Sequence, residues 1–193
     1  EWKKRAEIPS YVFDLLKNLP ATTHPMTMFS LAILAMHNES VFTPRYIDGM
    51  KKAEYWDAYL EDSLNLTAKL PSLAAFIYNL KYRNGEYIPL NPDLDWAANF
   101  AHMIGKGDDL EYQEQCRLFF FLHADHEGGN VSAHTSYIVA SALSDVYYAV
   151  SAGMDGLAGP LHGLANEDCL RWLLNMRKSF TEFPTAEQVS QYA

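Results

Sequence analysis

Hydrophobic positions recur at helical spacing along most of this chain. Between positions 8 and 19 they step by three and four residues, and a proline follows them: Val12, Leu15, Leu16, Leu19 and Pro20. This pattern predicts an amphipathic helix that ends at the proline. Alternating apolar and polar residues, which would indicate strands, are scarce. We therefore expect an all-α fold.

The helical pattern continues beyond position 20. Residues 24–38 are apolar or small almost all the way round, which is typical of a helix enclosed on every side, and a partner subunit could supply one of those sides. A long helical period covers 54–82, where we expect Pro71 to introduce a kink. After the loop NGEYIPLNPDLDW, further helices are expected over 94–104 and 110–121. The apolar run RLFFFLH then predicts a buried segment at 117–123.

Length and composition indicate a folded globular protein. The 193 residues suffice for one domain or a large part of a bigger one, and 49% of them are hydrophobic against 20% charged. The net charge of −9 argues against nucleic acid or an anionic membrane as partner, because both attract clustered lysine and arginine. The apolar stretches fall short of the roughly 20 residues that a membrane span requires. The start EWKKR, without a methionine, predicts a piece of a longer protein.

The polar sequence HADHEGGNVSAHTS, at 123–136, follows the apolar run directly and predicts a functional site. Six of the ten glycines lie between Gly128 and Gly163, so backbone freedom is concentrated here. His123 and His126 are three residues apart, which on a helix would place both on one face, where we favour binding of a substrate. The alternatives are two core histidines or a metal site, although HADHE matches neither HExxH nor HxxEH.

A second candidate is His162, in the segment GLAGPLHGLANEDCLRWLL. We expect it at or just inside the start of a helix, where the positive end of the helix dipole disfavours an added proton. A neutral imidazole there could donate an N–H to an oxygen that becomes anionic during a reaction. The alternative is a histidine that only fills a helix start.

The remaining histidines and the cysteines offer weaker signals. A hydrolase built on Ser132 and His134 is conceivable, but the sequence has no GxSxG motif. His24, His37 and His102 lie near expected helix ends, where capping or surface roles are the default. Two isolated cysteines, Cys116 and Cys169, lack CxxC spacing and predict neither a disulfide framework nor a zinc motif.

Taken together, HADHEGGNVSAHTS, ALSD and GLAGPLHGLAN resemble citrate synthases of the mitochondrial, eukaryotic type. The similarity extends through EWKKRAEIPS, LPATTHPM, AKLPSLAAFIY and LDWAANF, so nearly the whole chain resembles a central block of that family, without its N-terminal section and final third. The resemblance implies part of the large helical domain over 1–163, with apparent dimer-interface helices. It also implies a helix at the junction with the small domain over 164–193, and a homodimer in the mitochondrial matrix.

The resemblance also implies roles for particular residues. His162 matches the histidine that hydrogen-bonds the acetyl thioester carbonyl as the enol forms, while His126 and His123 match residues of the oxaloacetate pocket. We expect Asn130 and Ser132 to support them. Lys52 matches a basic residue near the coenzyme A phosphates, a less specific correspondence. No permanently bound cofactor and no metal are implied, and acetyl-CoA serves as co-substrate.

Parts of the family's chemistry are missing from this chain. The general base Asp, a second catalytic histidine and the substrate arginines would lie beyond position 193, so we expect residues 1–193 alone to be inactive. Val146 stands where the family suggests Pro, and Asp155 where it suggests Asn. Three alternatives remain open: a methylcitrate synthase using propionyl-CoA, a structural paralogue that serves assembly, and a metal-dependent hydrolase.

Overall fold

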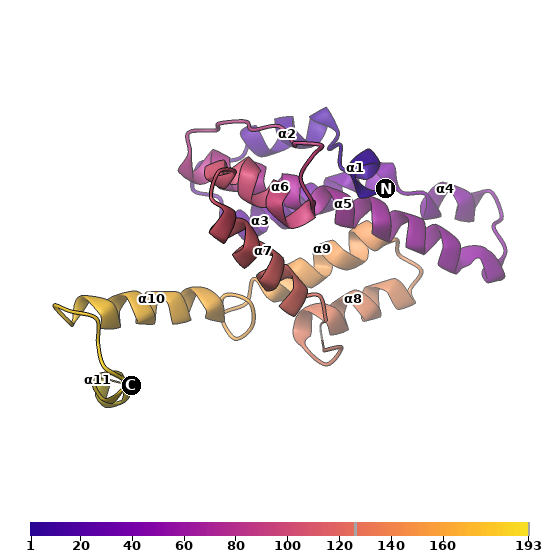
Figure 1. Cartoon of the computed structure of the whole chain (residues 1–193). Helices are drawn as coiled ribbons and strands as arrows, with labels where there is room; N and C mark the ends of the chain where they lie inside the picture. The colour runs from indigo at the N-terminus through magenta and orange to yellow at the C-terminus, as the bar shows by residue number, and fades with distance from the viewer. Residues whose placement is uncertain (126, 193) are drawn as a thin grey trace.

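The computed structural model describes residues 1–125 and 127–192, and every regular element in these ranges is a helix. The predicted all-α class is therefore confirmed (Figure 1). In the described part of the chain, no helix has the length and apolar character that crossing a bilayer would require. The α-helices are α1 Trp2–Arg5, α2 Ser10–Lys17, α3 Pro25–Ala35, α4 Phe42–Ile47, α5 Tyr55–Tyr82, α6 Trp96–Ala101, α7 Leu110–Leu122, α8 Val131–Ser141, α9 Val146–Leu157, α10 Ala165–Lys178 and α11 Ala186–Tyr192.

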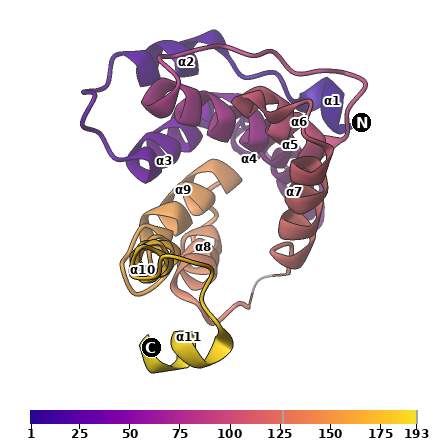
Figure 2. The same cartoon turned by 60° about the vertical axis from the view of Figure 1, so that its left-hand side comes forward.

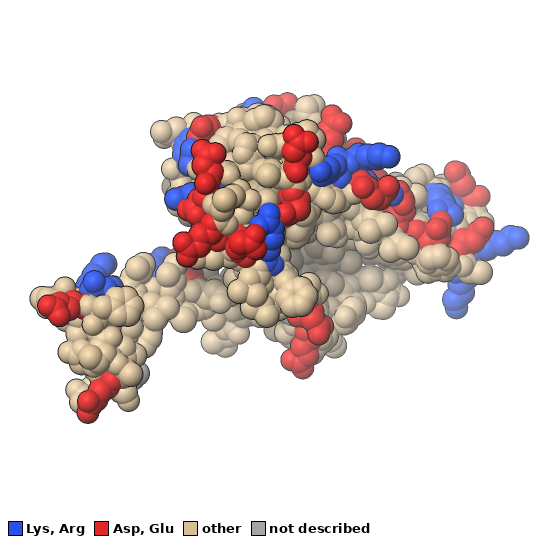
Figure 3. Space-filling view, in the orientation of Figure 1, with Lys and Arg blue, Asp and Glu red and all other residues tan. Residues whose placement is uncertain are grey.

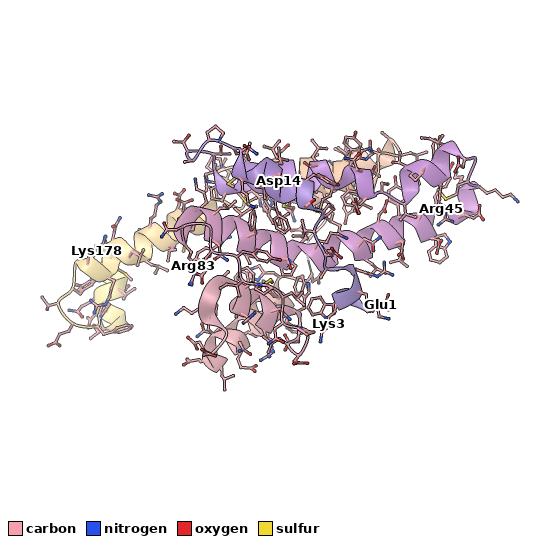
Figure 4. The ribbon with its side chains drawn as sticks, turned by 90° about the horizontal axis from the view of Figure 1, so that it is seen from above. Glu1, Lys3, Asp14, Arg45, Arg83 and Lys178 are labelled. Carbon is pink, nitrogen blue, oxygen red and sulfur yellow. The ribbon has the colours of Figure 1, made fainter. Side chains whose placement is uncertain are left out.

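The long helix α5 runs through the body of the molecule, from the side of Arg45 to that of Arg83 (Figure 4). It continues through Pro71 as one helix, and a kink at this proline stays a prediction. The buried carboxylate of Asp62 connects α5 to α4. Asp62 accepts hydrogen bonds from the backbone N–H groups of Val41 and Phe42 at the start of α4. These contacts satisfy helix-end donors that would otherwise lack a partner.

The main hydrophobic core forms where α2, α3, α5 and α9 meet. Helix α3 packs against α9 and α5, but Leu31 and Leu34 on its remaining side are 36% and 38% exposed. One side of this helix is thus uncovered within a single chain, and a partner subunit on that side stays a prediction. The buried members of the core are Ile8, Val12, Leu16, Met28, Ala32, Ile33, Met36, Leu66, Leu73, Phe76, Ile77 and Tyr147.

Helix α7 packs on α6 through one narrow face. Cys116 and Phe120 contact α6, whereas Phe119 and Phe121 are 57% and 77% exposed. The predicted burial of 117–123 is therefore wrong, because only every third or fourth residue of a helix can face a single neighbouring helix. Acidic side chains are prominent over α6 and α7, in keeping with the net charge (Figure 3).

Helices α8 and α9 form a closely packed hairpin that leads to the candidate site. Asp145 caps the start of α9, accepting from the backbone N–H groups of Tyr147 and Tyr148. Gly153 lets the helices approach, since a Cβ there would lie 2.9 Å from the carbonyl oxygen of Ser132. The position of Ser132 therefore depends on the packing of α8 against α9.

Helices α10 and α11 extend away from the rest of the chain (Figures 1 and 2). They contact each other through aromatic rings, with the centroids of Trp172 and Tyr192 5.9 Å apart. Leu170, Leu173 and Leu174 on α10 are each more than 40% exposed. The expected domain boundary after position 163 falls in the connection between α9 and α10, and the division into two domains stays a prediction.

Candidate active site

The candidate site is built around a contact between α8 and the connection that precedes α10. The Ser132 hydroxyl oxygen lies 2.8 Å from Nε2 of His162. Ser132 is 4% exposed, and His162 is partly exposed. This geometry brings together two of the residues that the sequence singled out.

The position of His162 differs from the expected one. Helix α10 begins at Ala165, so His162 precedes it in a series of turns that starts at Gly159. Within these turns the His162 N–H donates to the Gly159 carbonyl, and the His162 carbonyl accepts from the Ala165 N–H. The imidazole therefore faces the beginning of α8, and His162 lies before α10 and not within it.

Asn130 organises the beginning of α8. It is the N-cap, and its Oδ1 accepts from the Ala133 N–H at 3.0 Å and from the Ser132 hydroxyl at 2.8 Å. Its side-chain amide donates to the Glu127 carbonyl. Asparagine is among the strongest N-cap residues, so the local sequence could have revealed this role. The cap holds Ser132 beside His162.

The Ser132 hydroxyl has one proton, which it can donate either to Asn130 or to His162. When this proton goes to Asn130 Oδ1, the Ser132 oxygen accepts from an Nε2–H of His162. When it goes to Nε2, a neutral His162 carries its own proton on Nδ1, where it can donate to a ligand oxygen. The orientation of the Ser132 hydroxyl thus determines which nitrogen of the His162 imidazole acts as a donor.

His123 lies at the end of α7 and not within a helix shared with position 126. It is the C-cap, and its Nδ1 lies 2.7 Å from the Phe119 carbonyl oxygen, so Nδ1 carries a proton that it donates. Its ring stacks on Phe119 with centroids 4.0 Å apart. His123 therefore does not lie within a helix, since α7 ends at Leu122, and a shared pocket for His123 and His126 stays a prediction. The other member, His126, lies outside the described residues.

A groove of about 740 Å³ is lined in part by Gly163 and Leu164, the two residues that follow His162 in the sequence. It is bounded by the start of α3, the ends of α5, α7 and α9, and the start of α10, with His24, Tyr82, His123, Leu157, Gly163 and Glu167 among its lining residues. His24 caps α3 by accepting from the Met26 N–H, as expected for a histidine at a helix end. A hydrogen bond from Arg171 holds the pKa of Glu167 below its usual value.

Lys52 lies far from His162 within one chain. It belongs to the short helix Lys52–Glu54 in the connection between α4 and α5 and is exposed. In Figure 1 the connection between α4 and α5 lies on the right, whereas the connection between α9 and α10, to which His162 belongs, lies on the left.

The Ser132–His134 hydrolase is not supported by the contacts of these residues. Ser132 contacts His162 instead, while His134 is exposed on α8. Within 1–125 and 127–192, no group of three or more His, Cys, Asp or Glu residues is placed to hold a metal ion.

One polar cluster was not predicted from the sequence. The buried Asp145 carboxylate lies 2.5 Å from Nδ1 of His37 and 2.9 Å from the Thr43 hydroxyl. Asp145 is more than a hundred positions from His37 and Thr43, and these two residues belong to different helices. No local sequence pattern therefore indicated the cluster.

Comparison with known proteins gives a consistent result. The family described as "Citrate synthase, C-terminal domain" matches residues 1–192. The whole chain is 49% identical to a probable mitochondrial citrate synthase of Glossina morsitans morsitans, and 46% identical to a mitochondrial 2-methylcitrate synthase of Fusarium solani. It covers 41% and 42% of these relatives. The citrate synthase structure from Pyrobaculum aerophilum matches 88% of the chain and 42% of that protein, with a TM-score of 0.77 and 34% identity.

Proposed function

Because the chain belongs to the citrate synthase family, we propose that the intact protein condenses acetyl-CoA with oxaloacetate and water to give citrate and CoA. This is an acyltransferase reaction, and it belongs to the tricarboxylic acid cycle. The chain spans about two fifths of the length of the curated relatives it matches. The observation that carries the proposal is the contact of the His162 imidazole with Ser132, directly before Gly163, which lines the groove.

His162 stabilises the enol in this mechanism. A base removes a proton from the acetyl methyl group, and the thioester oxygen gains negative charge as the enol forms. The Nδ1–H of His162 donates to that oxygen when the Ser132 hydroxyl turns its proton from Asn130 Oδ1 to Nε2, because Nε2 then accepts and the His162 proton stays on Nδ1. The enol carbon then attacks the oxaloacetate ketone, and water cleaves the thioester to release citrate and CoA. No residue of this chain is assigned as the base.

Oxaloacetate binding involves the segment between α7 and α8. His123 presents a ring whose Nδ1 is engaged with Phe119, which leaves Nε2 to accept from a donor or, when protonated, to donate to a carboxylate. We assign His126 to the same pocket from the family resemblance. The two carboxylates of oxaloacetate also need arginines.

The thiol-release assay tests the proposal directly. The intact protein is mixed with acetyl-CoA and oxaloacetate, and the free thiol of CoA is measured together with citrate. Formation of both products in equal amounts is expected. A protein that folds and assembles but releases no thiol would contradict the enzymatic function and favour the structural paralogue. Residues 1–193 alone should release none.

A 2-methylcitrate synthase is the second candidate, because the Fusarium solani relative is nearly as similar as the Glossina one, at 46% against 49% identity. The two enzymes differ in one methylene of the acyl group, which is worth about 10- to 200-fold in discrimination. The ratio of kcat/KM for acetyl-CoA to that for propionyl-CoA separates them. A ratio above one supports the citrate synthase.

We also propose a homodimer located in the mitochondrial matrix. The exposed Leu31 and Leu34 on α3 give an apolar surface for a second chain, and a dimer would allow Lys52 of one chain to approach the CoA of the other. The double variant Leu31→Lys, Leu34→Lys should be monomeric in sedimentation experiments, because it places charges in the contact. An unchanged dimer would contradict this interface. Fractionation of cells tests the location.

A further inference from the structure

The chain segment that precedes α8 packs against a tyrosine that lies about one and a half helical turns into α8. Residues 127–130 form a turn in which the Asn130 N–H donates to the Glu127 carbonyl at 3.4 Å. Tyr137 lies over Gly128, since a Cβ added to Gly128 would be 3.1 Å from Cε2 and 3.6 Å from the hydroxyl oxygen of Tyr137. This contact is separate from the hydrogen bonds that connect Asn130, Ser132 and His162.

We propose that Tyr137 is a positioning residue, whose ring fixes the 127–130 turn and thereby the donor geometry of His162. The inference rests on the proposed function for its consequence in catalysis. Tyr137 is 62% exposed. Its role therefore depends on the part of the ring that contacts the turn, and not on the buried fraction of the whole side chain. Helical side chains lean toward the N-terminus, which is why residue 137 reaches back over residue 128.

The contact reaches His162 in three steps. The ring of Tyr137 holds Gly128, and the turn that contains Gly128 ends at Asn130. Asn130 Oδ1 accepts the Ser132 hydroxyl, and Ser132 contacts Nε2 of His162. A shift of the turn therefore changes how often the Ser132 hydroxyl donates to Nε2 of His162 and how often it donates to Asn130 Oδ1. Because the ring acts through packing, its hydroxyl is not required.

Three variants test this role in the intact protein. Tyr137→Ala removes the ring and should lower kcat by about 10-fold, as small misplacements near reacting groups do. Tyr137→Phe keeps the ring and should restore kcat to within about twofold of the parent. Ile138→Ala, on the same helix with a 57% exposed side chain, is the control for a general effect of truncating α8 and should leave kcat unchanged.

A spectroscopic measurement separates this inference from the proposed function. The imidazole ¹⁵N signals of His162, assigned with His162→Gln, report which ring nitrogen carries the proton. They should change in Tyr137→Ala and stay unchanged in Tyr137→Phe. If the signals behave so in a protein that makes no citrate, the positioning role stands and the proposed function fails. Unchanged signals in Tyr137→Ala, or equal changes in Tyr137→Phe, would overturn the positioning role.

A double-mutant cycle adds a second test. In Gly128→Ala the new methyl group would be 3.1 Å from the Tyr137 ring, so the turn or the ring must move. We expect the His162 signals to change in Gly128→Ala when Tyr137 is present and to respond much less in the Tyr137→Ala background. Equal effects of Gly128→Ala in both backgrounds would show that the two residues act independently and would contradict the inference.

Discussion

The Ser132 hydroxyl and Nε2 of His162 lie 2.8 Å apart, although thirty positions separate the two residues in the sequence. Ser132 belongs to the first turn of α8, and His162 to the turns before α10. The contact joins the two segments that carry the strongest sequence resemblance to citrate synthases. It also gives His162 a partner that determines which ring nitrogen can donate.

His162→Ala should abolish most of the activity. In the proposed mechanism this residue stabilises the oxygen of the enol, and loss of one such donor lowers kcat by about 100- to 1000-fold. Steady-state assays of the intact protein measure the change. The matched control is His134→Ala, which removes an exposed histidine of α8 and should retain the parent kcat. A variant at position 162 with full activity would refute the assigned role.

Ser132→Ala should have a smaller effect. It removes the hydrogen bond to Nε2 but leaves the imidazole in place, so we expect kcat to fall by about 10-fold, the equivalent of one hydrogen bond of about 1.4 kcal/mol. Ser141→Ala, at the other end of α8, removes a hydroxyl that donates to the Ile138 carbonyl and serves as the control. Equal kcat values for both variants would argue against the role of Ser132.

Asp62 should make the stability depend on pH. Its carboxylate is fully buried, and this burial raises its pKa despite hydrogen bonds from Val41, Phe42 and Ser40. The folded chain therefore holds the proton to higher pH than the unfolded chain does. The resulting stabilisation is complete below the unfolded pKa of about 3.9 and is lost as the pH rises through the folded pKa.

Asp62→Asn provides the comparison, because an amide does not titrate. Between pH 4 and 7, the free energy of unfolding of the parent minus that of the variant should decrease, by at most about 1.4 kcal/mol per pH unit. Urea titrations followed by circular dichroism measure both proteins. A difference that stays constant or increases over this range would contradict the raised pKa.

His37→Ala should destabilise the chain without touching the candidate site. The substitution removes a hydrogen-bond partner of the buried Asp145 carboxylate, which then retains Thr43 and the two backbone donors of α9. Loss of a partner from a buried polar group costs about 1–3 kcal/mol. Asn38→Ala, which removes an exposed side chain next to His37, is the control and should change the free energy of unfolding by less than about 0.5 kcal/mol. Equal stabilities would contradict the contribution of this pair.

The sequence predicted the helices well because their signals are local. The spacing at 8–19, the long period at 54–82 and the proline and glycine boundaries correspond to α2, α5 and the neighbouring loops. The cap at His24 was also predictable, since a capping side chain bonds to a residue only two positions away. For the candidate site, the sequence identified His162, Ser132 and Asn130 as members but not the hydrogen bonds that connect them.

The errors concern burial and helix ends. The run at 117–123 was expected to be buried, yet Phe119 and Phe121 are exposed because α7 packs on α6 through one face only. His162 was expected at a helix start but precedes α10 by three residues. Local periodicity gives the apolar content of a segment, whereas the number of neighbours that cover it depends on the whole arrangement.

The sequence by itself determined the helical class, the approximate helix boundaries and, through its motifs, the family. The tertiary structure alone decided that Ser132 faces His162, that Asp145 meets His37, and that the α4–α5 and α9–α10 connections lie on opposite sides of the chain (Figure 1). The physical reason is distance along the chain. Backbone hydrogen bonds and side-chain spacing within a helix act over about four residues, while these pairings follow from how α8, α9 and the connections around them pack together.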